Sequence, residues 1–137
     1  MKILLIIFFL QSAVSTICAQ SLSVIVGNVK NSKGYIRVAV YNSKETFMKQ
    51  QVAIGEARAT EGQVVVTIDK LRDGEYALSI MHDSNNNEKL DTNLIGLPKE
   101  GFAFSNDAMG TVGPPTFKEA SFRVQGPTAH AVKLRYY

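Results

Sequence analysis

One polar stretch of this chain carries side chains suited to holding a metal ion. Oxygen-bearing residues recur in it as Asp83, Asn85, Asn87 and Asp91. This D-x-N-x-N-x-x-x-D spacing is that of a calcium loop, in which alternate side chains and one backbone carbonyl converge on a hard cation with about six to eight oxygen ligands. The carbonyl at the seventh loop position would come from Lys89. The sequence therefore predicts a calcium site formed by these five residues.

The loop departs from the usual calcium pattern at two positions. Its sixth residue is normally glycine because the backbone turns sharply there, but here it is Glu88, for which a left-handed conformation costs on the order of 1 kcal/mol. The neighbouring asparagines tolerate that conformation better, so the bend could move by one residue. The twelfth position is Leu94, so Glu100 or Asp107 would have to complete the ligand set. We expect weak binding, around ~10⁻⁴ to 10⁻³ M. The competing interpretation is an Asn-rich surface turn that binds no ion.

Residue types that could support catalysis are few. A hydrolase built on His82 would need a serine nucleophile, and Ser84 and Ser105 are near it only in sequence and lie in no G-x-S-x-G elbow. No third ligand at zinc spacing accompanies His82 and His130. We therefore expect a protein that is not an enzyme. A small periplasmic hydrolase that uses His82 and neighbouring loop residues is the alternative.

The elements that must position these residues are strands. Apolar residues alternate with polar ones in six runs, and turn-forming residues such as Asn, Asp, Gly and Pro separate the runs. This pattern predicts an all-β protein with a single antiparallel β-sandwich of about seven strands, immunoglobulin-like or transthyretin-like, and one long loop. One helical turn is expected within Ser43 to Gln51. The expected core includes Val66, Leu78, Ile80, Phe122, Val132 and Leu134.

The long loop, residues 93–116, is the second candidate functional region. It is rich in Gly and Pro, and long loops within compact domains are usually functional or packed by their own side chains. Its aromatic residues could close over one end of the sandwich, or they could remain open to a ligand or partner. The residues that we expect at such a surface are His82, Glu100, Phe102, Phe104, Asn106 and Phe117.

The first residues predict export. A positive Met1-Lys2, an apolar run from Ile3 to Leu10 and Ala19 before the expected cleavage site are typical of a secretory signal peptide, residues 1–19. Cleavage leaves 137 − 19 = 118 residues, a single β-sandwich domain over 20–137 without cysteine. Cys18 raises a lipoprotein as the alternative, although the preceding Ile17 is bulkier than such processing prefers.

The charge of the chain bears on the kinds of partner that it could bind. The formal net charge is +3, and the basic residues form no run. This argues against nucleic acid as a partner. No segment after residue 19 approaches the ~20 apolar residues of a membrane span. We expect a secreted or periplasmic monomer that binds a protein, glycan or small ligand.

Several motifs together resemble a known family. The polar stretch from His82 to Asp91 is followed by Ile95-Gly96-Leu97-Pro98-Lys99-Glu100-Gly101-Phe102, then Phe104-Ser105-Asn106, then Gly113-Pro114-Pro115-Thr116-Phe117-Lys118-Glu119-Ala120. This order resembles the bacterial secreted family called domain of unknown function 2141. The resemblance implies a single exported β-sandwich with no assigned activity.

A second, more distant resemblance lies in the residues that lead into one predicted strand. Leu71-x-x-Gly74-x-Tyr76 is similar to transthyretin-like and collagen-adhesin B-type sandwiches, some of which carry Asp/Asn calcium loops. The Lys–Asn crosslink of such adhesins is not expected here. Lys30 could supply the lysine, but the segment Ala129 to Tyr137 has no asparagine or aspartate. Together these patterns favour an exported binding or structural module whose long aromatic loop is ordered by calcium.

Overall fold

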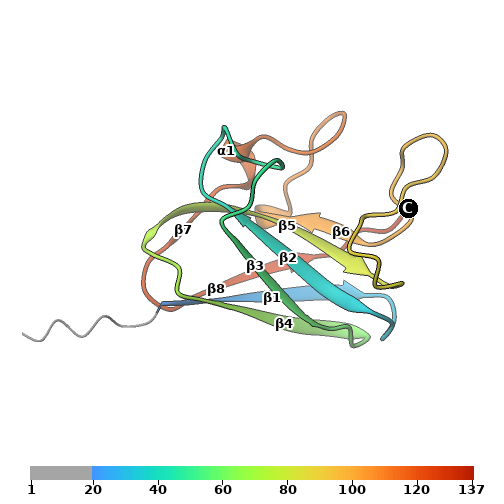
Figure 1. Ribbon diagram of the computed structural model, residues 1–137, viewed down its shortest axis with the longest axis horizontal. Coiled ribbons are helices and arrows are strands. Elements are labelled where there is room, and N and C mark those ends of the chain that lie inside the picture. The colour runs from blue at the N-terminus through green and yellow to red at the C-terminus, as the bar shows by residue number, and fades with distance from the viewer. Residues whose placement is uncertain (1–19) are drawn as a thin grey trace, which may run out of the picture.

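The computed structural model describes residues 20–137. The predicted signal peptide and Cys18 lie outside the described residues. Two β-sheets pack face to face, and the short helix α1 lies on the outside of one of them (Figure 1). The elements are β1 Ser21–Val29, β2 Tyr35–Tyr41, β3 Ala53–Arg58, β4 Gly62–Asp69, β5 Gly74–Asp83, β6 Phe102–Phe104, η1 Ser105–Asp107, α1 Phe117–Ala120, β7 Phe122–Val124 and β8 Thr128–Lys133.

The strand order confirms the predicted β-sandwich and adds one strand to the expected number. One sheet has the order β4-β1-β8, and the other has the order β3-β2-β5-β6 with β7 paired to the start of β5. The described strands thus number eight rather than about seven. All pairs are antiparallel except β1 with β8, which run parallel. The centre of the second sheet is formed by β2 and β5, so side chains on their outer face share one surface.

The core between the sheets follows the alternation seen in the sequence. Every second residue of β1, β2 and β4 is buried there. The core prediction is confirmed for Val66, Leu78, Ile80, Val132 and Leu134, all buried in one cluster. It is confirmed only in part for Phe122, which packs against this cluster, is partly buried, and stacks on the His130 ring at a centroid distance of 3.9 Å.

Strand β3 is absent from the sequence prediction because its inward residues are small. Ala53, Gly55 and Ala57 share the alternating face, and only two of them carry a methyl group. A Cβ on Gly55 would lie 2.7 Å from Ile68 Cγ1 and 2.9 Å from Val66 Cγ1. The side chains of β4 therefore fill the space that larger β3 residues would need, and the usual hydrophobic signal of a strand is missing.

A second apolar cluster lies on the outer face of the five-stranded sheet. Tyr41, Phe47, Phe102 and Phe104 are buried in it. The long loop is not structureless, since it leads into strand β6 of this sheet and the short helix η1. The expected turn after β2 is present, with the Phe47 amide donating to the Ser43 carbonyl at 3.1 Å. Three loop segments rise above this sheet in Figure 1: residues 42–52, 84–101 and 108–116.

Candidate functional site

Asp83 ends β5 opposite Tyr35 of β2, and its carboxylate is fully buried. Oδ2 accepts hydrogen bonds from Arg37 Nε at 2.7 Å and the Glu88 amide at 2.9 Å, while Oδ1 accepts from the Asn87 amide at 3.0 Å. Burial works against the charged form of Asp83. The hydrogen bonds from Arg37 and the two amides outweigh burial and hold the pKa of this carboxyl below its usual value.

These bonds shape the loop that follows Asp83. Asn86 and Glu88 both have positive φ, 57° and 62° respectively. The sharp bend therefore remains at the sixth loop position, Glu88, where calcium loops usually have glycine. Asn86, two residues earlier, is a second residue in the left-handed conformation. Each such residue with a Cβ costs on the order of 1 kcal/mol. The buried Asp83 carboxylate offsets that cost by accepting the amides of the fifth and sixth loop residues.

Three of the predicted metal ligands converge on one another. Asn85 Nδ2 lies 2.7 Å from Asp91 Oδ2, and Asn87 Nδ2 lies 3.0 Å from both Asp91 carboxylate oxygens. In this arrangement the amides act as donors to Asp91. An ion between these groups would require both amides to turn and present their oxygens, which an asparagine side chain can do because its oxygen and nitrogen occupy similar positions.

The loop offers mainly uncharged oxygens to a cation. Among residues 20–137, no three side chains of His, Cys, Asp or Glu gather where they could hold a metal ion. A cation in this loop would depend on amide and carbonyl oxygens from Asn85, Asn87 and Lys89 together with Asp91. Arg37 already supplies one positive charge to Asp83, which lowers the attraction of that carboxylate for a further cation.

Glu100 closes the loop from the other side. Its side chain is buried; Oε1 accepts from the Ser84 amide and hydroxyl, both at 3.1 Å, and Oε2 accepts from the Asp91 amide at 3.1 Å. Glu100 therefore joins the two ends of the loop and does not face solvent. Asp107 is occupied elsewhere, since it accepts the Lys133 amide of β8 at 2.8 Å.

His82 is buried in the packing rather than open to a pocket. Its Nε2 lies 2.8 Å from the Lys33 carbonyl and its Nδ1 lies 2.9 Å from the Tyr136 hydroxyl. Because a carbonyl only accepts, Nε2 carries the proton and Nδ1 accepts from Tyr136. Burial raises the pKa of Tyr136, and the hydrogen bond from the Lys30 amide to the phenol oxygen opposes this change.

The two serines considered as nucleophiles are engaged elsewhere. Ser84 binds Glu100, and Ser105 Oγ donates to the Ala120 carbonyl and accepts the Leu78 amide at 2.9 Å. Neither hydroxyl is hydrogen-bonded to a histidine. The geometry described here contains no nucleophile and base pair around His82.

Two other predicted surface residues hold the long loop in place. The Asn106 side chain donates to the carbonyls of Glu119 and Ser121, at 3.1 and 2.8 Å, and so ties η1 to the end of α1. Phe117 is half-buried and meets Phe47 edge to face at 5.9 Å between ring centroids. Phe117 thus packs against the outer apolar cluster, while Asn106 holds two parts of the chain together by hydrogen bonds.

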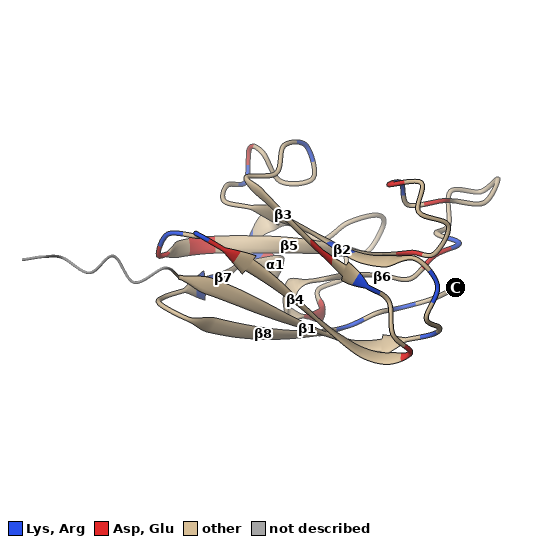
Figure 2. Cartoon of the chain, turned by 60° about the horizontal axis from the view of Figure 1, so that its bottom comes forward, with Lys and Arg blue, Asp and Glu red and all other residues tan. Residues whose placement is uncertain are grey.

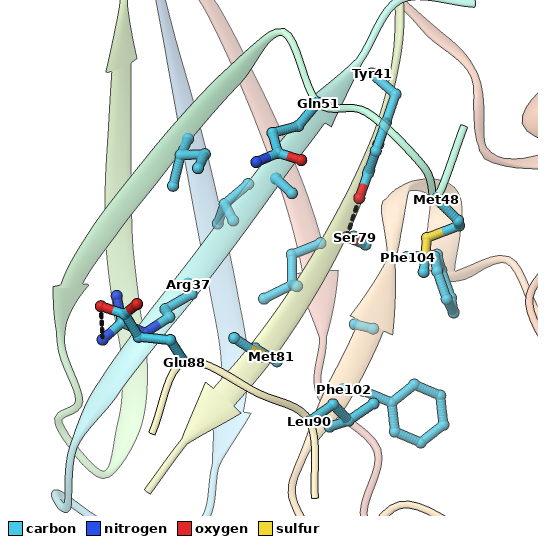
Figure 3. A pocket seen from close by; sticks show the side chains of 15 residues that line it. Arg37, Tyr41, Met48, Gln51, Ser79, Met81, Glu88, Leu90, Phe102 and Phe104 are labelled. Atoms are coloured by element: carbon cyan, nitrogen blue, oxygen red, sulfur yellow. Dashed lines mark hydrogen bonds and ion pairs between the residues drawn. The ribbon is translucent and has the colours of Figure 1, made fainter. Parts of the chain in front are cut away.

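A trough of about 620 Å³ crosses the outer face of the five-stranded sheet (Figure 3). Ala39, Ser79 and Met81 form its floor on β2 and β5. Phe102 and Phe104, two of the predicted surface residues, line one side of it. The remaining lining comes from Arg37, Val38, Tyr41, Met48, Gln51, Ile54, Ile80, Glu88, Leu90 and Ala103. We name this cavity the sheet trough.

The sheet trough places the predicted calcium loop beside the aromatic segment. Glu88 and Leu90 of the loop line the trough together with Phe102 and Phe104. A neighbouring cavity of about 470 Å³ shares Leu90 and both phenylalanines and extends under the segments 96–98 and 109–114. The polar loop therefore forms part of a concave, largely apolar surface, an arrangement common at ligand sites.

Comparison with known families identifies the chain. The family described as uncharacterised protein conserved in bacteria, DUF2141, matches residues 24–132. The chain belongs to the DUF2141 family. The match includes both sheets, the polar loop and the aromatic segment. No curated protein and no solved structure matches the chain significantly.

The sequence predicts only some of the residues that line the sheet trough of this DUF2141 protein. Phe102 and Phe104 are expected at a surface, whereas Ala39 and Ser79 are not among the residues that the sequence predicts at a site. Small outward residues on two central strands, Ala39 and Ser79, are the signal that could have indicated a hollow. Large apolar side chains at the loop tips are exposed as well, notably Leu94, Ile95 and Val112.

The surface charge of the DUF2141 protein is mixed. Figure 2 shows Lys and Arg spread over several loops and strands, with acidic residues between them. In the part of the chain that the structure describes, no helix has the length and apolar character needed to cross a membrane.

Proposed function

We propose that this DUF2141 protein is an exported, non-enzymatic binding module that holds an apolar or amphipathic ligand in the sheet trough. The observation that carries the proposal is the trough itself, because its volume is within the range of ~300–1,000 Å³ usual for small-molecule sites. Its aromatic side, Phe102 and Phe104, belongs to a packed cluster, so the site is largely formed before a ligand arrives. The N-terminal signal pattern supports export.

The surroundings of His82 support a non-enzymatic role. Both ring nitrogens are bound to other groups of the chain, and the imidazole is buried away from the trough. Among residues 20–137, those that line the trough include no histidine, cysteine or aspartate, and the Ser79 hydroxyl in its floor lies 3.4 Å from the Tyr41 hydroxyl.

Filling the sheet trough should weaken ligand binding. We expect Ala39→Leu to lower the affinity for a simple apolar probe, 1-octanol, by at least about tenfold, because the added side chain occupies the floor that the probe would cover. Chemical-shift titration by NMR measures this affinity and shows whether the shifts lie at trough residues. The matched control is Thr67→Leu, which adds the same apolar side chain on an exposed position of β4. Octanol shifts spread over the whole surface, or equal affinity in both variants, would count against the trough as the site.

We further propose that the loop from Asp83 to Asp91 binds calcium weakly and so fixes one side of the trough. The spacing of its oxygen ligands and the convergence of Asn85 and Asn87 on Asp91 support this proposal. The ion would replace amide-to-carboxylate hydrogen bonds by amide-oxygen coordination. Since Glu88 and Leu90 belong to both loop and trough, ordering the loop would stiffen the binding surface.

Calcium should raise the thermal midpoint of the protein. At ten times its dissociation constant, a ligand that binds the folded state alone adds about 1.4 kcal/mol, or roughly 4–8 °C for a domain of this size. Asp91→Ala should abolish the rise, whereas Asp69→Ala, which removes the same charge from β4, should preserve it. Magnesium should have a smaller effect, since it demands a tighter shell. Differential scanning calorimetry with millimolar calcium tests this, and an equal rise in the two variants would favour the Asn-rich turn.

A further inference from the structure

The charge that the sheet trough offers to a ligand is negative. Arg37 is committed to the chain itself: Nε binds Asp83 at 2.7 Å, Nη2 binds Asn86 Oδ1 at 2.6 Å, and Nη1 pairs with Glu56. Glu88 is different. Its carboxylate lies 3.9 Å from Arg37 Nη2, beyond hydrogen-bonding length, and its side chain is 78% exposed. One guanidinium thus faces three carboxylates, and the least engaged of these lines the trough.

The backbone is strained at residues that line this trough. Met48 and Glu88 have φ values of 60° and 62°, a region that disfavours side chains with a Cβ. Apart from Gly, Asn and Asp, Lys70 is the other residue with positive φ among residues 20–137. Two of these three strained residues therefore carry side chains of the trough lining, one apolar and one acidic. Strained backbone of this kind tends to occur at ligand sites.

The floor of the trough favours a small molecule over a peptide strand. Both β2 and β5 are central strands with hydrogen-bonded neighbours on each side, so their backbone groups are not free to pair with an added strand. Along β2 the trough lining extends from Arg37 to Tyr41, which is four residue steps or about 13 Å at ~3.3 Å per step. That length suits an extended alkyl chain with one end at Glu88 and the other near Tyr41.

We propose that the sheet trough binds a small cationic amphiphile, a molecule with an alkyl or aromatic body and a single ammonium group. The apolar body lies on Ala39, Ser79 and Met81 against Phe102, and the ammonium group pairs with Glu88 at the end where Arg37 is already neutralised. This assignment rests on the proposed function of the trough and specifies its ligand class. Anionic amphiphiles are disfavoured, because they would place a second carboxylate beside Glu88.

Three eight-carbon probes test the assignment on the complete domain, residues 20–137. Octylammonium, 1-octanol and octanoate carry similar alkyl chains and a positive, a neutral and a negative head group respectively, and NMR titration at low salt gives the affinity of each. We expect octylammonium to bind about two- to fivefold more tightly than 1-octanol, and octanoate to bind more weakly than either. High salt should remove these differences, since the Glu88 carboxylate is exposed.

Glu88→Gln provides the matched variant. It keeps the shape of the side chain and removes the charge, so octylammonium and 1-octanol should bind it equally, while Glu61→Gln on the distant β3–β4 turn should retain the wild-type preference. Equal affinity of octylammonium and 1-octanol for the wild type, or tighter binding of octanoate, would overturn the cationic assignment and leave the trough as an apolar site. Failure of all three probes to bind would overturn the proposed function too.

Discussion

Arg37→Ala is expected to destabilise the protein by about 3 kcal/mol, which corresponds to a fall in thermal midpoint of roughly 10–15 °C. The reason is the environment of Asp83. Its carboxylate is fully buried at the end of β5, and Arg37 is the cation that pairs with it, at 2.7 Å. Removing Arg37 leaves this charge with two backbone amides but no counter-ion, and an uncompensated buried charge is far more costly than a lost surface ion pair. Thermal or urea unfolding measures the loss.

The control lies in the same ion network. Glu56 also pairs with Arg37, but its side chain is 51% exposed, so Glu56→Ala should cost no more than ~1 kcal/mol. A loss for Arg37→Ala as small as that for Glu56→Ala would show that Asp83 is solvated in solution.

The stability difference between wild type and Arg37→Ala should depend on pH because of the pKa of Asp83. Because the folded-state pKa is lowered, the ionised carboxylate stabilises the fold above about pH 4 and this contribution is lost as pH falls through the folded value. Protonated Asp83 needs no counter-ion. The difference in stability between wild type and Arg37→Ala should therefore be largest near neutral pH and should shrink below about pH 4.

The strands that the sequence predicts are those whose inward side chains are large and branched. Leu22, Val24 and Val26 in β1 and the equivalent residues of β2 and β4 alternate with polar neighbours, and the structure buries each of these sets. The alternation fails where packing needs small residues, as at Gly55 in β3, and where both faces are covered, as in β6, whose three residues are all buried. Neither strand has the period of two that the pattern requires.

The site is only partly visible in the sequence because its residues come together through sheet pairing. The spacing of Asp83, Asn85, Asn87 and Asp91 is local, so the loop could be found without a structure. Arg37 is brought to Asp83 by the register of β2 with β5, in which Tyr35 pairs with Asp83, and no local spacing indicates that contact. The trough has the same origin, since Ala39 and Ser79 are register partners forty residues apart.

Gly34→Ala is the second substitution with a large expected effect, about 2–5 kcal/mol. Gly34 begins the approach to β2 with φ of +68°, and a Cβ there would lie 1.9 Å from the Asp83 carbonyl oxygen and 2.8 Å from Ser84 Cα. For alanine the left-handed conformation costs ~1–2 kcal/mol. The overlap adds about 1–3 kcal/mol to this cost, because the atoms that the Cβ meets are backbone and cannot rotate away.

Gly126→Ala separates these two contributions. Gly126 has a similar φ of +61° but no atom within 4 Å of the added Cβ, so alanine there pays the conformational cost alone. Unfolding experiments on both variants should show Gly34→Ala at least ~1 kcal/mol less stable than Gly126→Ala. Because the overlap displaces the backbone of Asp83 and Ser84, Gly34→Ala should also diminish the calcium-dependent rise in midpoint, while Gly126→Ala should keep it. Equal stability of the two variants would mean that β2 and the start of the loop are farther apart in solution than the fold described here requires.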